Sequence, residues 1–476
     1  MVNQELLNLS LREIVEGILT KKFSSFEVTT ACLEASKKLQ NPFNSFISIY
    51  AEEALNLANK ADQLIMKNKI IGPLHGVPLA HKDTYYRKNR KVTCGSKIRQ
   101  NFIPSKTATI LSKLDSAGAI HLGGLNTSDS GCNPFGLNIL NGRAKNPWNP
   151  DYITGGSSSG SASAVSARLI YGSFGSDSGG SVRLPASMCG VVGLKPTDGL
   201  ISRHGIMPLS YTLDCPGPLT RTVADCALLT SIVAGHDSLD INTCKKPVPI
   251  YERSLENNIK GLKIGTPKNY FFDNISPEIS DSVRDSLKIF STLGAEIVEI
   301  KVPDCKFMDI LGNVIIFSEG ARVHKRWLKD RPEEYTPITR KALEFGLCIS
   351  ATSYIEAVTY RKKALASFLE NVFSKVDVLH TPTMTQNVPT ISQINEYLEN
   401  EKGLPFNLAR NTKPANYMGL PSLSVPCGFS DEFTPISFQL IGPPFSETQL
   451  FNLGHCFQET TNFHKKIPKH VEFSDS

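Results

Sequence analysis

The sequence lacks the cysteine spacing of a metal or redox site. Its 476 residues include 11 cysteines, spread from Cys32 to Cys456, and no two of them form a Cys-x-x-Cys pair. No cluster of cysteine and histidine has the spacing of a zinc site. In a chain of this length, such cysteines are typical of reduced and mostly buried thiols. We therefore predict a cytoplasmic protein that needs neither a metal nor another cofactor.

Long hydrophobic runs are also missing. No apolar run reaches the roughly 18 residues that a membrane-spanning helix requires. The N-terminal segment carries Glu5 and Glu13, whereas a signal peptide would have a basic start followed by an apolar core. The composition, 40% hydrophobic and 20% charged, is ordinary for a globular protein with a large core. We therefore predict no membrane partner.

Positive charge is in small excess and scattered. The net charge is +6, and the densest basic patch is residues 87–91, which follow Tyr85 and Tyr86. Such a patch beside aromatic residues could contact a nucleic acid, but a short run of this kind is more typical of a solvated turn. We interpret it as a solvated turn.

Local patterns predict helices first and an α/β arrangement afterwards. Ser10 with Glu13, and Ser24 with Glu27, fit the capping box that begins a helix, so the first 65 residues are expected to be mainly helical. Beyond residue 70, short apolar strands alternate with helical segments, which favours a sheet covered by helices on both faces. The strands are expected near residues 43–50, 77–81, 119–122, 170–175, 261–265, 295–302, 423–428 and 436–442.

The region between about 240 and 400 has a different character. It opens with polar turns and then contains long helical segments, expected near 309–328 and 353–373. We interpret it as an excursion that covers the site instead of a separate domain. The chain is therefore divided into N-terminal helices (1–65), a core (66–235), the excursion (240–400) and a return to the core (401–476), all within one domain (1–476).

The most informative stretch runs from Gly155 to Arg183. It contains two glycine-flanked serine clusters, 155–160 and 176–183, separated by one helix-length of small residues. Glycines beside a serine let the backbone approach a ligand closely and turn its N–H groups toward one point. Acyl transfer needs such a hydroxyl nucleophile with donors for an oxyanion. A flexible linker is the alternative, but a linker would not lead into apolar runs such as 191–194.

A serine nucleophile needs a base. The ten histidines form no pattern that suggests a Ser–His–Asp triad. Lys82 is the best candidate, because it ends an apolar strand that begins after Gly76. A lysine buried there would lose hydration, which lowers its pKa and leaves a neutral amine that can accept a proton. A surface lysine is the alternative interpretation.

These motifs resemble those of the amidase signature family. The likeness is strong over residues 70–235 and looser over 415–465. It rests on the segment ending at Lys82 and on residues 155–160, 175–183, 189–197, 217–225 and 425–428. The resemblance implies a single large α/β/α domain, with a central mixed twisted sheet covered by helices on both faces. It also implies hydrolysis of a carboxylic acid amide.

The resemblance further implies the roles of individual residues. Ser181 would be the nucleophile, Ser157 a bridging serine and Lys82 the base, with the Gly156–Ser157 peptide in the cis form. The oxyanion would be held by backbone N–H groups, those of Ser178, Gly179, Gly180 and Ser181, since consecutive small residues form a concave nest of donors. Supporting roles would fall to Ser158, Asp177 and Arg183.

The sequence departs from the family pattern at two places. Many relatives have Asn-Met-x-Glu-Phe where this chain has residues 126–130, a segment expected near the substrate-facing surface. The position before the double glycine, often Thr or Ile, is Ser178. Substrate specificity is therefore expected to depend on residues 126–133 and on the 240–400 excursion.

Three functions remain open from the sequence. The leading hypothesis is a free amidase that acts on a small-molecule amide; the resemblance leaves a homodimer open. The alternative is the glutaminase subunit of an aspartyl/glutamyl-tRNA amidotransferase, which would act with partner subunits and transfer RNA. Residues 126–130 and 410–421 resemble free amidases more closely. A non-catalytic binding relative is the third interpretation, and the complete triad argues against it.

Overall fold

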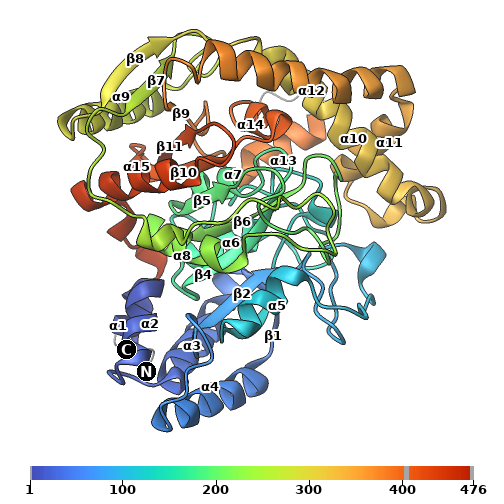
Figure 1. Cartoon of the computed structure of the whole chain (residues 1–476). Coiled ribbons are helices and arrows are strands. Elements are labelled where there is room, and N and C mark those ends of the chain that lie inside the picture. Colours follow the sequence, from blue (N-terminus) through green and yellow to red (C-terminus); the bar gives the residue numbers. More distant parts are fainter. Residues whose placement is uncertain (1–2, 401–406, 472–476) are drawn as a thin grey trace.

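The N-terminal part is helical, as the capping patterns predict. The computed structural model describes residues 3–400 and 407–471. Both capping boxes are formed, with Ser10 paired to Glu13 and Ser24 paired to Glu27. The elements at the bottom of Figure 1 are α1 (Gln4–Asn8), α2 (Leu11–Leu19), α3 (Ser25–Phe43), β1 (Phe46–Ile49) and α4 (Ala51–Met66).

A mixed eight-stranded sheet forms the centre of the molecule (Figure 1). Strands β7, β8 and β9 pair in parallel, and the other neighbours pair antiparallel. In spatial order the strands are β4 (Gly172–Asp177), β6 (Cys215–Thr220), β5 (Val192–Lys195), β10 (Ser422–Phe429), β11 (Pro435–Ile441), β9 (Val378–Pro382), β7 (Lys263–Pro267) and β8 (Glu296–Ile300). The predicted mixed sheet is confirmed.

A smaller sheet extends this centre beyond β4. It has the order β1-β3-β2, with β3 (Ile120–Leu125) between β1 and β2 (Pro78–Lys82). Two hydrogen bonds tie β2 and the residues after it to β4: the Phe174 N–H donates to His81 Nδ1 at 3.1 Å, and the Tyr85 hydroxyl donates to the Gly175 carbonyl at 2.6 Å. The end of β2, which carries Lys82, therefore lies beside the end of β4.

Helices cover both faces of the central sheet. On one face, α8 (Val223–Val233), α9 (Pro277–Thr292) and α15 (Glu447–Thr460) pack on the strands, α15 contacts both of the others, and α5 (Thr109–Ser116) lies against α8. On the other face, α6 (Ser159–Ser166) and α7 (Arg183–Cys189) pack together. One large cluster of buried apolar side chains joins the sheet to the N-terminal helices and to these layers. No helix in the described ranges is long and apolar enough to cross a membrane.

The 240–400 region contributes to the sheet as well as covering it. Its strands β7, β8 and β9 complete one edge of the sheet; β7 and β8 lie at predicted strands, and β9 was not predicted. Besides α9, it contains the helices α10 (Cys305–Asp330), α11 (Pro337–Cys348), α12 (Ala351–Asn371) and α13 (Ile391–Asn400). Helix α10 packs against α11, α12 and α14 (Lys413–Met418), at the upper right of Figure 1.

The basic turn at residues 87–91 is held by carboxylates. The Arg87 guanidinium donates to both oxygens of Asp115, at 3.0 and 2.9 Å. Arg90 pairs with Glu53 and lies 4.6 Å from the centre of the Tyr50 ring. The guanidinium groups are thus engaged within the chain, in agreement with the interpretation as a solvated turn.

Candidate active site

Lys82 is buried at the end of β2, with 1% of its surface exposed. Its Nζ donates to Ser157 Oγ at 2.7 Å and to Ser176 Oγ at 2.9 Å. The strand ends where β4 also ends, so one lysine can reach both serine clusters. The structure therefore brings Lys82 and Ser157 into direct contact.

Burial gives this lysine an unusual acidity. Loss of hydration lowers the pKa of Lys82 to about 8, although the negative charge of Asp214 opposes the shift. A lysine with this pKa is half neutral at about pH 8, and the lone pair of the neutral form can accept a proton. The direction agrees with the prediction made from the apolar strand.

Ser157 lies at a special point of the backbone. The Gly156–Ser157 peptide bond is cis, as predicted from the family resemblance. The Ser157 carbonyl accepts hydrogen bonds from the Thr127 hydroxyl at 2.8 Å and from the Ser128 N–H at 3.1 Å. These contacts hold the backbone while the side chain faces Lys82.

Ser181 lies in the loop formed by residues 177–183, which joins β4 to α7. Its side chain is half-buried and lines a cavity, whereas the side chain of Ser157 is buried and does not line it. The Ser158 N–H donates to the Ser181 carbonyl at 3.2 Å, and this bond joins the two serine clusters. Of the three predicted triad residues, Ser181 is thus the one in contact with the cavity.

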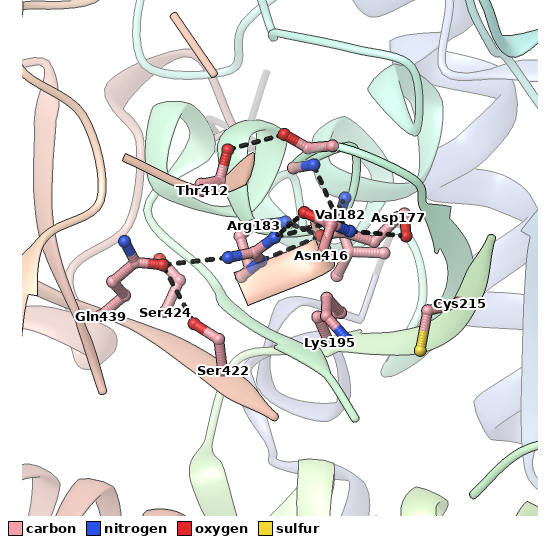
Figure 2. Close-up of polar contacts among 12 residues, drawn as sticks. Asp177, Val182, Arg183, Lys195, Cys215, Thr412, Asn416, Ser422, Ser424 and Gln439 are labelled. Carbon is pink, nitrogen blue, oxygen red and sulfur yellow. Dashed lines mark hydrogen bonds and ion pairs between the residues drawn. The ribbon is translucent and has the colours of Figure 1, made fainter. Parts of the chain in front are cut away.

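Asp177 organises the 177–183 loop (Figure 2). One carboxylate oxygen accepts from the Gly180 N–H at 2.7 Å, and the other accepts from the Val182 and Arg183 N–H groups at 3.2 and 3.3 Å. The Arg183 Nε donates to the same carboxylate at 3.1 Å, and both side chains are fully buried. Asp177 and Arg183 therefore brace the loop from inside, as expected.

Residues far along the chain complete this network. The Arg183 guanidinium donates to the Asn416 side chain at 2.6 Å and to the Gln439 side chain at 3.1 Å (Figure 2). The Asn416 amide donates back to Asp177 at 2.8 Å. Burial alone would raise the pKa of Asp177, but the Arg183 guanidinium and these hydrogen bonds hold it at about 2. The carboxylate is therefore charged over the whole physiological range.

The peptide between Gly179 and Gly180 is held on both sides. Its carbonyl accepts from the Thr412 hydroxyl at 2.7 Å, and its N–H donates to Asp177 at 2.7 Å. The Gly180 N–H, one of the predicted oxyanion donors, is therefore paired with Asp177 in this structure. No hydrogen bond is found for the N–H groups of Ser178, Gly179 and Ser181 within the described chain, so these three donors remain for the role.

Ser178 has a carboxylate partner. Its hydroxyl donates to Asp214, and the other oxygen of Asp214 accepts from the Leu209 N–H at 2.9 Å. Burial raises the pKa of Asp214 to about 6 despite these hydrogen bonds. The position where relatives often have Thr or Ile thus carries a side chain that ties the loop to residues just before β6.

Residues 126–130, which were expected near the substrate-facing surface, are buried and directly precede residues that line the cavity. All five residues are buried, with 0 to 3% of their surfaces exposed. Asn126 donates to the carbonyls of Asn44 and Gly142, and Asp129 accepts from the Thr336 N–H at 2.7 Å. The segment supports Ser157 and connects it to the start of α11. Only the residues that follow, 131–133, reach the cavity.

A cavity of about 420 Å³ opens beside Ser181. Two helices of the 240–400 region form one side of it. We call these side chains the pocket wall: Asn313, Ile316 and Phe317 on α10, and Ile338 and Ala342 on α11. Their three- and four-residue spacings place them on one face of each helix.

Several contributors were missed from the sequence. Ser176 lies inside a recognised motif, but nothing indicated that its hydroxyl would contact Lys82. Thr412 and Asn416 lie within the segment 410–421, which was noted only for its resemblance to free amidases. Their hydrogen bonds to the 177–183 loop were not predicted. Helix α11 begins at Pro337, and a proline in the first turn after Thr336 was an available start signal. No cluster of potential metal ligands occurs in the described part of the chain.

Comparison with known proteins agrees with this geometry. The family model named Amidase matches residues 27–451. The chain is 37% identical to a glutamyl-tRNA(Gln) amidotransferase subunit from Clostridium botulinum, over 97% of this chain and 99% of that one. The structure of a glutamyl-tRNA(Gln) amidotransferase subunit from Thermotoga maritima superposes with a TM-score of 0.82 at 29% identity, over 98% of each chain. A protein from a vestigial complex linked to the origin of an s-triazine catabolic enzyme gives a TM-score of 0.88 at 29% identity, over 95% of this chain and 98% of that one.

Proposed function

Because the chain belongs to the amidase signature family, we propose that it hydrolyses a carboxylic acid amide through Ser181, Ser157 and Lys82. The observation that carries the proposal is the buried contact between Lys82 Nζ and Ser157 Oγ, 2.7 Å long, next to the half-buried Ser181. An ordinary lysine is protonated near neutral pH and cannot accept a proton, but burial lowers the pKa of Lys82 to about 8. The residues 1–476 are proposed to work as one domain, since the 240–400 strands are part of the central sheet.

The first half of the reaction forms an acyl-enzyme. The Ser181 oxygen attacks the amide carbonyl carbon, its proton passes to Ser157, and the Ser157 proton passes to neutral Lys82. The resulting oxyanion is stabilised by N–H groups of the 177–183 loop, a contribution of about 3–4 kcal/mol for a donor at comparable sites. The C–N bond then breaks, and the proton returns through Ser157 to the leaving nitrogen, which departs as ammonia or an amine.

The second half releases the acid. A water molecule gives a proton to Ser157, which again passes its own proton to Lys82, and the hydroxide oxygen attacks the ester carbonyl. Collapse of this intermediate breaks the bond to the Ser181 oxygen. The proton on Lys82 returns through Ser157 to Ser181, so the enzyme regains its starting state.

Replacement of the nucleophile tests the proposal. Ser181→Ala should abolish release of ammonia from simple amides while circular dichroism and thermal unfolding stay as in the wild type. Ser161→Ala is the matched control, because Ser161 lies in the same serine-rich stretch and its buried hydroxyl has no hydrogen-bond partner among the described residues. Turnover by the Ser181→Ala protein would contradict the nucleophile assignment.

A glutaminase subunit of a tRNA-dependent amidotransferase is the second candidate. It is favoured by the 34 to 37% identity to glutamyl-tRNA(Gln) amidotransferase subunits over nearly the whole chain. We propose the free amidase first, because residues 410–421 resemble free amidases. Purification from its native source distinguishes the two. A chain that purifies without partner subunits and hydrolyses simple amides contradicts the amidotransferase alternative, whereas glutamine hydrolysis that requires partner subunits supports it.

A further inference from the structure

The cavity beside Ser181 is enclosed mainly by apolar side chains. Besides the pocket wall, it is lined by Phe135, Leu184, Leu209 and Leu408. Its volume of about 420 Å³ falls within the roughly 300–1,000 Å³ of typical small-molecule sites. The space therefore exceeds what an acetyl group would fill, and its surface would favour an apolar group.

The charged side chain that lines this cavity is already neutralised. Lys413 Nζ lies 2.8 Å from an Asp309 oxygen, and both side chains are mostly buried, with 13% and 12% exposed. The other oxygen of Asp309 accepts from the Asn407 amide at 3.0 Å. Among the described lining residues, Lys413 is the sole charged one. A substrate carboxylate or ammonium would thus lose hydration here without gaining an unpaired counter-charge, which is unfavourable.

The polar side chain of Asn133 is also engaged within the chain. Its oxygen accepts from the Leu137 N–H at 3.0 Å and from the Phe135 N–H at 3.3 Å, and its amide donates to the Leu137 carbonyl at 3.1 Å. These bonds shape the turn that presents Phe135 to the cavity. Asn133 therefore supports the apolar lining and leaves few polar groups for a substrate.

The pocket wall directly adjoins the reacting centre. A Cβ atom placed on Gly179 would lie 3.3 Å from the Ile316 side chain and 3.5 Å from the Lys413 side chain. Ile316 and the aliphatic part of Lys413 thus cover the loop that carries Ser181. An acyl group attached to Ser181 would therefore meet apolar atoms from its first carbons onward.

We infer that this cavity binds the acyl part of a neutral, apolar amide of medium size, aliphatic or aromatic, and that it disfavours amino-acid amides such as glutamine. This inference rests on the proposed amidase activity and narrows its substrate class. The discrimination comes from apolar surface, which favours larger acyl groups, and from the absence of an unpaired charge among the described lining residues.

Four primary amides test the inference with the purified full-length protein. Acetamide, hexanamide, phenylacetamide and L-glutamine are compared by kcat/KM for ammonia release. We expect hexanamide and phenylacetamide to exceed acetamide by about tenfold or more, and to exceed glutamine by about 100-fold or more. Acetamide or glutamine as the best substrate would overturn the inference but leave the amidase activity standing. Hydrolysis that persists in Ser181→Ala, or no hydrolysis of any amide, would instead contradict the proposed function.

Variants of the pocket wall locate the specificity. Ala342→Phe should reduce the preference for phenylacetamide over acetamide by about tenfold, because the added ring occupies the cavity. Ala366→Phe is the matched control, since Ala366 is exposed on α12, and it should leave the preference unchanged. Ile338→Ala removes apolar surface and adds no side-chain volume to the cavity. It should lower the preference for hexanamide over acetamide by about threefold. An unchanged preference in either folded wall variant contradicts the assignment.

Discussion

The two sides of Ser181 are built on opposite physical principles. The 177–183 loop is held by a buried ion pair, by hydrogen bonds that Asn416 and Thr412 donate, and by a hydrogen bond that Gln439 accepts from Arg183. The pocket wall on α10 and α11 is apolar in four of its five side chains. A polar network loses much when one member is removed, because its partners are left buried without hydrogen bonds. An apolar wall loses only contact area and volume.

Under the proposed function, the polar network of the loop supports the reaction, and the apolar pocket wall selects the substrate. The network orients the backbone donors and tolerates little change. The wall can change one side chain at a time, at a cost that depends on the size of the side chain removed. Related enzymes can therefore keep one reaction while acting on different acyl groups.

The largest expected effect concerns Lys82. Lys82→Met should lower kcat by at least about 1,000-fold, in the upper part of the range for general-base catalysis. In the wild type, kcat/KM should rise with pH through about 8, because the amine accepts a proton only when neutral and its pKa is about 8. The measurement is a pH profile of ammonia release between pH 6 and pH 10.

A second buried lysine provides the control for this profile. Lys195 is 1% exposed and donates to the Pro196 carbonyl at 2.8 Å. Lys195→Met should keep the rise through pH 8. If Lys82→Met kept it as well, Lys82 could not be the base.

The next effect concerns the buried ion pair of the loop. Arg183→Met should lower the free energy of unfolding by about 3–5 kcal/mol, because Asp177 is left charged and buried. Urea denaturation followed by circular dichroism measures it. The Arg340–Glu344 pair on α11 is the control, since both side chains are 44% exposed. Arg340→Met should cost at most about 1 kcal/mol, and equal losses would contradict the claim that burial makes the ion pair of the loop costly to break.

Gly180 tests how tightly the loop is packed. Its φ is +130°, and an added Cβ would lie 2.3 Å from the Thr412 hydroxyl. Gly261 has a φ of +82° with nothing within 4 Å of an added Cβ. Gly261→Ala should therefore cost only about 1–2 kcal/mol of unfolding free energy for the backbone conformation. Gly180→Ala should cost about 1–3 kcal/mol more because of the clash, and should also lower kcat.

Thermal or urea unfolding of the two glycine variants measures the difference between their unfolding free energies. Similar losses in both would mean that the Thr412 contact relaxes easily, and the loop would then be less rigid than its network suggests.

The smallest effect concerns the hydroxyl of Thr412. Thr412→Val keeps the shape of the side chain but removes the hydrogen bond to the Gly179 carbonyl. We expect a loss of about 1 kcal/mol in stability and roughly a threefold to tenfold fall in kcat, because the peptide beside the oxyanion donors is less well held. Urea unfolding and steady-state kinetics measure the two effects.

The control for this variant lies far from the site. Thr461 at the end of α15 donates a similar hydrogen bond, 2.8 Å long, to the Phe457 carbonyl. Thr461→Val should lower the free energy of unfolding but leave kcat unchanged. A fall in kcat of the same size would show that the effect is not local to the loop.

Much of the fold could be predicted from local patterns. The capping boxes at Ser10 and Ser24 depend on contacts within four residues, so the sequence alone contains them. Strands β5, β6 and β9 were missed, because each is short and fully buried. Helix α11 was missed because it follows directly on a turn. The order of strands in the sheet depends on contacts between distant segments, which no local pattern reports.

The candidate site divides in the same way. The motifs with Ser157, Ser181 and Lys82 could be recognised as chemical groups, and the burial of Lys82 followed from its apolar strand. Two hydrogen bonds could not be predicted: the one from Lys82 to Ser176 and the one from the Gly180 N–H to Asp177. Both depend on distances that are set by several packed elements. For the same reason, the burial of residues 126–130, which were expected near the substrate-facing surface, could not be predicted.

The sequence by itself determined which groups can react and which helices can form, since both follow from residue type and short-range spacing. Only the tertiary structure decided which groups meet. It places Lys82 beside Ser157, 75 residues away along the chain, and it covers Ser181 with helices α10 and α11. The physical reason is that hydrogen bonds and apolar contacts act over a few ångströms in space, whatever the separation of their partners along the chain.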